Sequence, residues 1–246
     1  MPPNTLSTQS IRSPDDLPQI YCVIPAAGVG KRMQANHPKQ YLTIDDKTII
    51  EHTVTRLQQL PFISKIVIAI SPGDQYFADL SLASDKGIQV VDGGLERVDS
   101  VLAGLTALAA RAECAFDAWV LVHDAARPNV SCQDIEKLVR ECLAQNKGGI
   151  LATPVKDTMK RGAAEIEHTE SRENLWHALT PQFFRLRLLI EALTSALADG
   201  VNVTDEASAV EHQNQPVLLV EGRADNIKIT RPEDLALTSF YLRNNR

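Results

Sequence analysis

The chain has 246 residues, of which 44% are hydrophobic and 23% are charged. This composition is ordinary for a globular protein and excludes a disordered chain, a collagen and a coiled-coil rod. Lys and Arg total 25 and Asp and Glu total 31, which gives a net charge of −6. Bulk charge therefore argues against binding of nucleic acid or of an anionic membrane, and an anionic ligand would need a local basic cluster.

The first residues are polar and lack the basic and apolar regions of a secretory signal. We therefore predict a flexible tail over residues 1–20 and a single domain over residues 21–246. No apolar run approaches the ~20 residues of a membrane-spanning helix. The four cysteines form no CxxC pair, which favours buried free thiols over a disulfide framework or a zinc site, and a reducing, cytoplasmic location.

Short apolar runs alternate with helical patterns along the chain. We expect strands at 21–27, 65–70, 88–91, 118–123, 149–153, 217–220 and 227–229. We expect helices at 48–60, 97–110, from Ser131 to 145, at 182–198, from 204, and at the C-terminus after the N-cap Thr230, with Glu233 at the capping-box position. Alternating strands and helices predict an α/β fold with a mainly parallel sheet, in which ligands bind beyond the carboxyl ends of the strands.

Residues 157–174 interrupt this alternation. They are mostly polar, with a turn near Arg161-Gly162, and so they cannot bury much apolar surface. We interpret them as a protruding hairpin arm, with a floppy surface loop as the alternative. An isolated hairpin is only marginally stable, so a long arm would gain stability by packing on a partner chain.

The loop after the first expected strand is rich in glycine and basic residues. Gly28 and Gly30 would let backbone N–H groups approach an anion closely, and Lys31, Arg32 and Lys39 supply a positive charge that the net balance does not predict. A phosphate chain fits three cations better than one carboxylate does. The alternative is a solvated basic turn.

Two better-known phosphate motifs do not fit this loop. The dinucleotide motif G-x-G-x-x-G requires a third glycine where this chain has Met33. A P-loop ending at Gly30 would require glycine in place of Pro25 and a hydroxyl residue in place of Arg32. What remains is a nucleotide-binding loop that uses Arg and Lys side chains.

Two further loops follow expected strands. Gly94 and Ser100 could read the edge of a flat base through backbone and hydroxyl groups, although a turn followed by a helix cap is the simpler alternative. Asp124 follows the fourth expected strand, and a lone carboxylate beside phosphates suits Mg²⁺. The alternative, compatible with the first, is an ion pair between Asp124 and Arg127.

Taken together, the motifs resemble the 2-C-methyl-D-erythritol 4-phosphate cytidylyltransferase family of the sugar-nucleotidyltransferase superfamily. The motifs that carry the resemblance are Pro25-Ala26-Ala27-Gly28-x-Gly30-x-Arg32-Met33, Pro38-Lys39-Gln40, Val91-Asp92-Gly93-Gly94, Arg97, Asp99-Ser100-Val101, His123-Asp124-Ala125-Ala126-Arg127-Pro128, Trp176-His177-Ala178-Leu179-Thr180-Pro181-Gln182, Thr204-Asp205-Glu206-Ala207 and Asp225-Asn226-Ile227-Lys228. The resemblance covers the chain from about Tyr21 to its C-terminus.

The resemblance implies a Rossmann-like nucleotidyltransferase domain whose β-arm clasps a second subunit in a homodimer. The implied reaction joins CTP and methylerythritol phosphate, with Mg²⁺, to give the CDP-alcohol and pyrophosphate. The implied nucleotide-binding residues are Ala26, Ala27, Gly28, Gly30, Gly94, Ser100 and Ala125. The implied catalytic residues are Arg32, Lys39, Arg172 and Lys228, and methylerythritol phosphate would be held by Asp124, Thr158, Arg172, Thr180, Thr204 and Lys228.

Three other functions remain open from the sequence. A cytidylyltransferase for another polyol phosphate, such as ribitol 5-phosphate, would carry similar CTP loops. A nicotinamide-dependent oxidoreductase would share the βαβ start, although the missing third glycine argues against it. A nucleotide-binding regulatory module would bind without catalysis.

Overall fold

A computed structural model describes residues 17–28, 33, 37–111, 114–115 and 117–244. Its centre is a seven-stranded sheet in the order β11-β7-β10-β6-β1-β4-β5. These strands are β1 (Ile20–Pro25), β4 (Ile63–Ile70), β5 (Ile88–Asp92), β6 (Trp119–Val122), β7 (Gly149–Pro154), β10 (Trp176–Arg185) and β11 (Leu218–Glu221). β10 runs antiparallel to both of its neighbours, whereas the other pairs are parallel. The predicted α/β class and mainly parallel sheet are confirmed.

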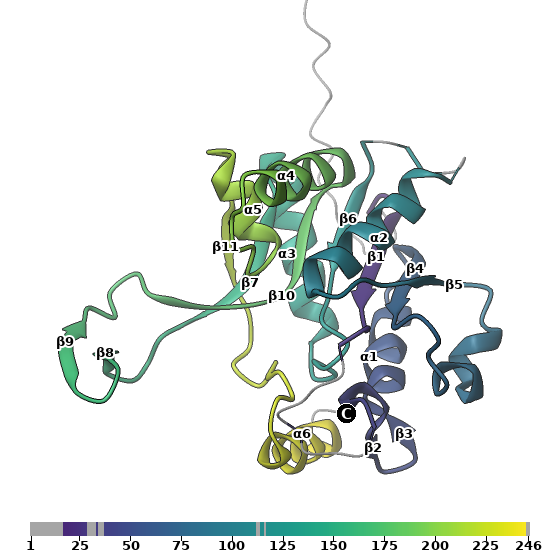
Figure 1. Ribbon diagram of the computed structural model, residues 1–246, viewed down its shortest axis with the longest axis horizontal. Coiled ribbons are helices and arrows are strands. Elements are labelled where there is room, and N and C mark those ends of the chain that lie inside the picture. The colour runs from purple at the N-terminus through teal and green to yellow at the C-terminus, as the bar shows by residue number, and fades with distance from the viewer. Residues whose placement is uncertain (1–16, 29–32, 34–36, 112–113, 116, 245–246) are drawn as a thin grey trace, which may run out of the picture.

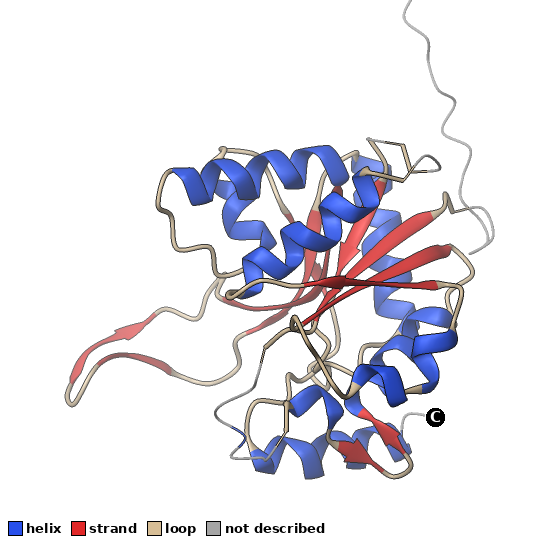
Figure 2. Ribbon diagram, turned by 45° about the vertical axis from the view of Figure 1, so that its right-hand side comes forward, coloured by secondary structure: helices blue, strands red, loops and turns tan. Residues whose placement is uncertain are grey.

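Helices cover both faces of the sheet (Figures 1 and 2). The helices are α1 (Ile49–Gln58), α2 (Arg97–Ala109), α3 (Cys132–Gln145), α4 (Leu186–Ala198), α5 (Glu206–His212) and α6 (Pro232–Asn244). α1 and α3 contribute to one buried apolar cluster, and α2, α4 and α5 to the other. Alternate residues of β1 face the two clusters, Cys22 on one side and Val23 on the other, so this strand is buried on both faces as its apolar run predicts.

A small layer lies below the carboxyl edge of the sheet in the view of Figure 1. It contains α6 and the short ribbon formed by β2 (Thr43–Ile44) and β3 (Lys47–Thr48). Its buried apolar residues include Ile44, Ile49 and Ile229. The chain therefore returns after β11 to pack next to the end of the sheet where ligands are expected.

Three sequence predictions are wrong in detail. The helix predicted from residue 182 begins at Leu186, because the residues before it form β10. Residues 227–229 form no strand, and the Ile229 N–H instead donates to the carbonyl of Ala126. The last helix is capped by Asp234, whose carboxylate accepts from the backbone N–H groups of Thr230 and Arg231, and not by Glu233.

The predicted arm contains β8 (Met159–Gly162) and β9 (Ile166–Glu170), which pair antiparallel as a two-stranded hairpin. Most of its residues are exposed, among them Ile166, whose side chain is 66% exposed. Figure 1 shows the hairpin extending well away from the sheet. Within this chain the hairpin has little apolar surface against which to pack.

The N-terminal boundary differs slightly from the prediction. Leu17 is buried and β1 already begins at Ile20, so packing starts before residue 21. The rest of the predicted tail, residues 1–16, lies outside the described residues.

Cys22, Cys114 and Cys142 are buried free thiols, and Cys132 is a partly exposed one. None of the helices described is both long and apolar enough to cross a bilayer.

Candidate active site

The loops that follow β1, β5 and β6 meet in one pocket of about 170 Å³ at the carboxyl edge of the sheet. Parallel strands bring their carboxyl ends to the same edge, so loops distant in the sequence become neighbours there. The pocket is lined by Pro25, Ala26, Ala27, Gly28, Lys39, Gln40, Gly94, Leu95, Glu96, Arg97, Ser100, Asp124, Ala125, Ala126 and Lys228. Two predicted residues of the first loop, Gly30 and Arg32, lie outside the described residues.

Two polar side chains hold the first loop in place where it leaves β1. Gln40 is 2% exposed and donates to the Ala26 carbonyl at 2.6 Å. The Ser71 hydroxyl donates to the carbonyl of Ala27 at 2.7 Å. Lys39 lines the same pocket next to Gln40, and its Nζ donates to the carbonyl of Ile229 at 2.7 Å. Contacts from Gln40 and Ser71, which lie in separate parts of the chain, therefore fix the beginning of the basic loop.

The second loop approaches the first very closely. A Cβ atom at Gly93 would lie 2.7 Å from the Cβ of Ala27, so only glycine fits this approach. Ser100 is 2% exposed, accepts from the Gly94 N–H at 3.2 Å and donates to the Glu96 carbonyl at 3.3 Å. The Ser100 hydroxyl thus fixes the orientation of the Gly94 peptide at the pocket wall.

The third loop places Asp124 among three cationic side chains. Its Oδ1 accepts from Arg97 Nε at 3.2 Å, and its Oδ2 accepts from Arg127 Nε at 3.1 Å and Lys228 Nζ at 3.0 Å. Asp124 is 6% exposed. Burial alone would raise the pKa of this carboxyl, but Arg97, Lys228 and Arg127 lower it well below its usual range. Asp124 is therefore ionised and organises the positive charge around it.

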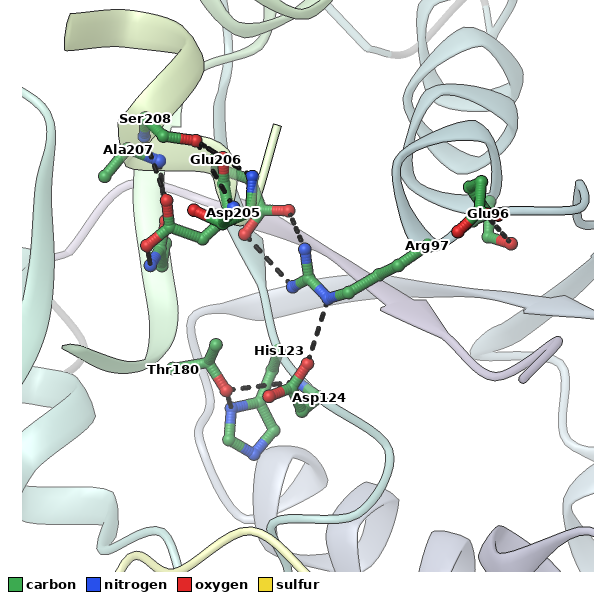
Figure 3. A network of polar contacts seen from close by, with 12 residues as sticks. Glu96, Arg97, His123, Asp124, Thr180, Asp205, Glu206, Ala207 and Ser208 are labelled. Carbon is green, nitrogen blue, oxygen red and sulfur yellow. Dashed lines mark hydrogen bonds and ion pairs between the residues drawn. The ribbon is translucent and has the colours of Figure 1, made fainter. Parts of the chain in front are cut away.

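Arg97 links this cluster to a second buried carboxylate (Figure 3). Glu206 begins α5, is 1% exposed, and accepts from both terminal nitrogens of Arg97, at 2.6 and 3.2 Å. Burial opposes the charge on Arg97, but Glu206 and Asp124 raise the pKa of its guanidinium above its usual value. The start of α2 and the start of α5 are thereby joined by one two-ended ion pair.

A second pocket of about 440 Å³ adjoins the first, and Lys228 lines both. Arg127 and Lys156 add positive charge to its wall, and Asp157 belongs to the root of the arm. This second pocket can hold another anionic group close to Asp124, on the side away from the β1 loop.

The remaining predicted residues lie elsewhere. Thr158 and Arg172 are exposed on the arm and, within the described part of the chain, line neither pocket. Arg172 donates to the carbonyl of Lys156 at 2.5 Å. Thr204 is exposed just before α5. Thr180 is 4% exposed and buried behind Asp124.

Two important residues had no role assigned from the sequence. Arg97 and Glu206 stand in the stretches that carry the resemblance, but their pairing joins positions 109 residues apart and no local pattern reveals it. Gln182 is similar: it is 1% exposed, donates to Asp205 Oδ2 and accepts from the Ala207 N–H. The sequence does contain one signal for Gln182, which is an amide side chain within an apolar strand, because a buried amide needs hydrogen-bond partners.

Comparison with known proteins agrees with this arrangement. The sequence profile of the family IspD, 2-C-methyl-D-erythritol 4-phosphate cytidylyltransferase, matches residues 20–244. The chain belongs to this family. An IspD protein of Cronobacter sakazakii is 59% identical over 227 residues, covering 91% of this chain and 93% of that protein. One of Vibrio parahaemolyticus is 54% identical over 226 residues, covering 91% and 95%.

Solved IspD structures have the same fold. A crystal structure of 4-diphosphocytidyl-2C-methyl-D-erythritol synthase superposes with a TM-score of 0.80 at 35% identity, covering 92% of this chain and 98% of that chain. The IspD structure from Francisella tularensis gives a TM-score of 0.78 at 34% identity, covering 91% and 99%. The family resemblance seen in the motifs is confirmed.

The ion pair of Glu206 supplies a first testable prediction for this IspD chain. Glu206→Gln should lower the free energy of unfolding by about 2 kcal/mol, because it leaves Arg97 with a weaker partner. This loss is smaller than for a fully buried pair, because Arg97 is partly exposed. Urea denaturation measures this loss. Glu211→Gln, an exposed change on the same helix, should stay within about 0.5 kcal/mol of the unmodified chain. Equal midpoints for the two variants would contradict a structural ion pair at Glu206.

Proposed function

We infer that this chain transfers the cytidylyl group of CTP to the phosphate of 2-C-methyl-D-erythritol 4-phosphate, giving 4-CDP-2-C-methyl-D-erythritol and pyrophosphate. This is a step of the non-mevalonate route to isoprenoid precursors. The observation that carries the inference is the meeting of the three loops in a pocket with Lys39, Arg97 and Lys228, in a chain of the IspD family.

CTP would occupy the first pocket. The phosphates would lie along Ala26, Ala27 and Gly28 with Gly30, and Arg32 and Lys39 would stabilise the charge of the transition state. The base would lie against Gly94, whose peptide is oriented by Ser100. Ala125 lines the same pocket and would contact the nucleotide.

The acceptor would occupy the adjoining pocket. Its phosphate would lie near Lys228, which lines both pockets, and Arg127 adds a second cation there. Thr204 and Asp124 would contact the acceptor from this chain. Thr158 and Arg172 are on the arm, so in a homodimer they would serve the site of the partner subunit.

The reaction needs little proton transfer. A phosphate oxygen of the acceptor attacks the α-phosphorus of CTP in line, and pyrophosphate leaves on the opposite side. A phosphate monoester is already anionic near neutral pH, so the nucleophile requires no general base. The obstacle is repulsion between two polyanions, and the cationic side chains offset it by electrostatic stabilisation and positioning.

Magnesium would be held mainly by the nucleotide. A phosphate-bound Mg²⁺ takes only one or two protein carboxylates, and Asp124 and Glu96 line the pocket. Both oxygens of Asp124 already accept from cationic side chains, and the described residues contain no group of three or more His, Cys, Asp or Glu side chains that could hold a metal. Direct binding of Mg²⁺ by Asp124 stays a prediction. When bound, the ion would neutralise part of the triphosphate charge.

The homodimer and the cytoplasmic location are also proposals. The exposed hairpin with Ile166 supports a dimer, because an isolated arm buries little apolar surface. The four free thiols support a reducing compartment.

Pyrophosphate release tests the proposed function directly. Release should require both CTP and methylerythritol phosphate, and UTP, ATP and GTP should give much slower release. Ribitol 5-phosphate serves as the competing acceptor in the same assay. Faster release with ribitol 5-phosphate, or release without any acceptor, would contradict the proposal.

The basic loop provides a second test. Lys39→Ala and Arg32→Ala should each lower kcat at least about a hundredfold, because each removes about 3 kcal/mol of transition-state stabilisation. Lys147→Ala, an exposed change at the far end of α3, is the control and should leave kcat unchanged. Thermal melting of each variant checks the fold. Near-normal kcat in both Lys39→Ala and Arg32→Ala would rule out this role.

Mixed dimers test whether the arm serves the partner. If Arg172 acts across the dimer, a dimer of one Arg172→Ala chain and one Arg32→Ala chain contains one intact site and one doubly altered site. Such dimers, isolated with two different affinity tags, should recover about half of the unmodified activity. Activity no higher than that of either parent variant would instead place both residues in the site of one chain.

A further inference from the structure

Two buried side chains lie directly behind Asp124 and have contacts that go beyond packing (Figure 3). His123 is fully buried at the end of β6, and Thr180 on β10 is 4% exposed. Thr180 Oγ1 lies 3.0 Å from His123 Nδ1 and accepts from the Asp124 N–H at 3.1 Å. The other ring nitrogen of His123, Nε2, lies 3.1 Å from the carbonyl oxygen of Arg127.

These contacts determine where each proton lies. The Arg127 carbonyl can only accept, so Nε2 of His123 carries a hydrogen and donates it. In a neutral ring Nδ1 is then an acceptor, and the Thr180 hydroxyl donates to it. The same hydroxyl oxygen keeps a lone pair for the Asp124 N–H. Every donor has one acceptor in this arrangement. A protonated ring would leave the Thr180 hydroxyl hydrogen without its acceptor.

This arrangement holds both ends of one turn. The Arg127 N–H donates to the Asp124 carbonyl at 3.2 Å, closing a turn over residues 124–127. Thr180 binds the N–H at its first residue, and His123 binds the carbonyl at its last residue. The carboxylate that collects Arg97, Arg127 and Lys228 is carried by the first residue of this turn.

We propose that His123 and Thr180 are positioning residues, in which the neutral His123 ring orients the Thr180 hydroxyl and the pair fixes the turn that presents the Asp124 carboxylate to its three cations. The importance of Asp124 for activity rests on the proposed function, whereas the hydrogen bonds of His123 and Thr180 are independent of it. It gives Thr180 a different role from direct contact with the acceptor. The single hydroxyl hydrogen of Thr180 is already donated, and Thr180 lines neither of the two pockets in the described part of the chain.

Kinetics distinguish positioning from substrate contact and from simple packing. Thr180→Val keeps the shape of the side chain but removes the acceptor of the Asp124 N–H, and should lower kcat/KM at least about tenfold. Thr180→Ser restores the hydroxyl and should recover most of that loss. The matched control is Thr238→Val, the same change at a fully buried threonine on α6 whose hydroxyl has no partner among the described residues, and it should leave kcat/KM unchanged.

A double-mutant cycle tests the route through Asp124. In an Asp124→Ala background, Thr180→Val should lower kcat/KM by less than about twofold further, because a positioning residue has nothing left to position. Effects that multiply fully would show that Thr180 acts on the acceptor directly and would overturn the proposal. Equal losses for Thr180→Val and Thr238→Val would also overturn it.

A spectroscopic measurement keeps the proposal independent of activity. In the full chain with ¹⁵N-labelled histidine, assigned through its loss in His123→Asn, the ring of His123 should show a protonated Nε2 and an unprotonated Nδ1 near neutral pH. A ring protonated at Nδ1, or at both nitrogens, would overturn the proposal even if Thr180→Val failed to fold. If the unmodified chain released no pyrophosphate, the proposed function would fail while this spectrum still decided the hydrogen-bond assignment.

Discussion

The carboxylate of Asp124 is the contact on which the rest of the site depends. A buried carboxylate is unfavourable unless it is paired, and here three cations provide the pairing: the nearby Arg127 and the sequence-distant Arg97 and Lys228. The converse is equally important, because three like charges would repel one another without a carboxylate between them. One buried negative charge therefore lets a protein with a net charge of −6 keep a dense positive region for phosphorylated ligands.

The fold brings the three cations to the same edge of the sheet as Asp124. Arg97 begins α2, Arg127 ends the turn after β6, and Lys228 lies in the segment that returns toward the sheet after β11. Each lies at the carboxyl edge because the strands before them are parallel and end there. Glu206 then restrains Arg97 from the opposite side, so its guanidinium is held between two carboxylates at a fixed position.

The sequence was sufficient to predict the class of fold and the edge of the sheet that carries the site, because buried parallel strands have a clear apolar pattern. It was not sufficient for β10. Pro181 interrupts that strand, and proline normally argues against a central strand. The ladder to β7 accommodates it by an irregularity between Ala178 and Gln182. The apolar residues after Pro181 also continue into α4, so the helical pattern seemed to begin earlier than it does.

The polar contacts within the site were beyond sequence reasoning for a related reason. Asp124 with Arg127 is a local pair and was foreseen as an alternative to metal binding. Arg97 with Glu206, and Asp124 with Thr180, join residues whose proximity arises only once the sheet order is known. The arm was recognisable from its polarity, whereas the surface on which it would pack depends on a second chain.

The course of β10 gives the molecule a mechanical property. This strand leaves the arm, pairs first with β7 and then with β6, and carries Thr180 and Gln182 along the way. Residues 171–175 connect the hairpin to β10, so a neighbouring molecule that displaced the hairpin would pull on the strand that carries Thr180.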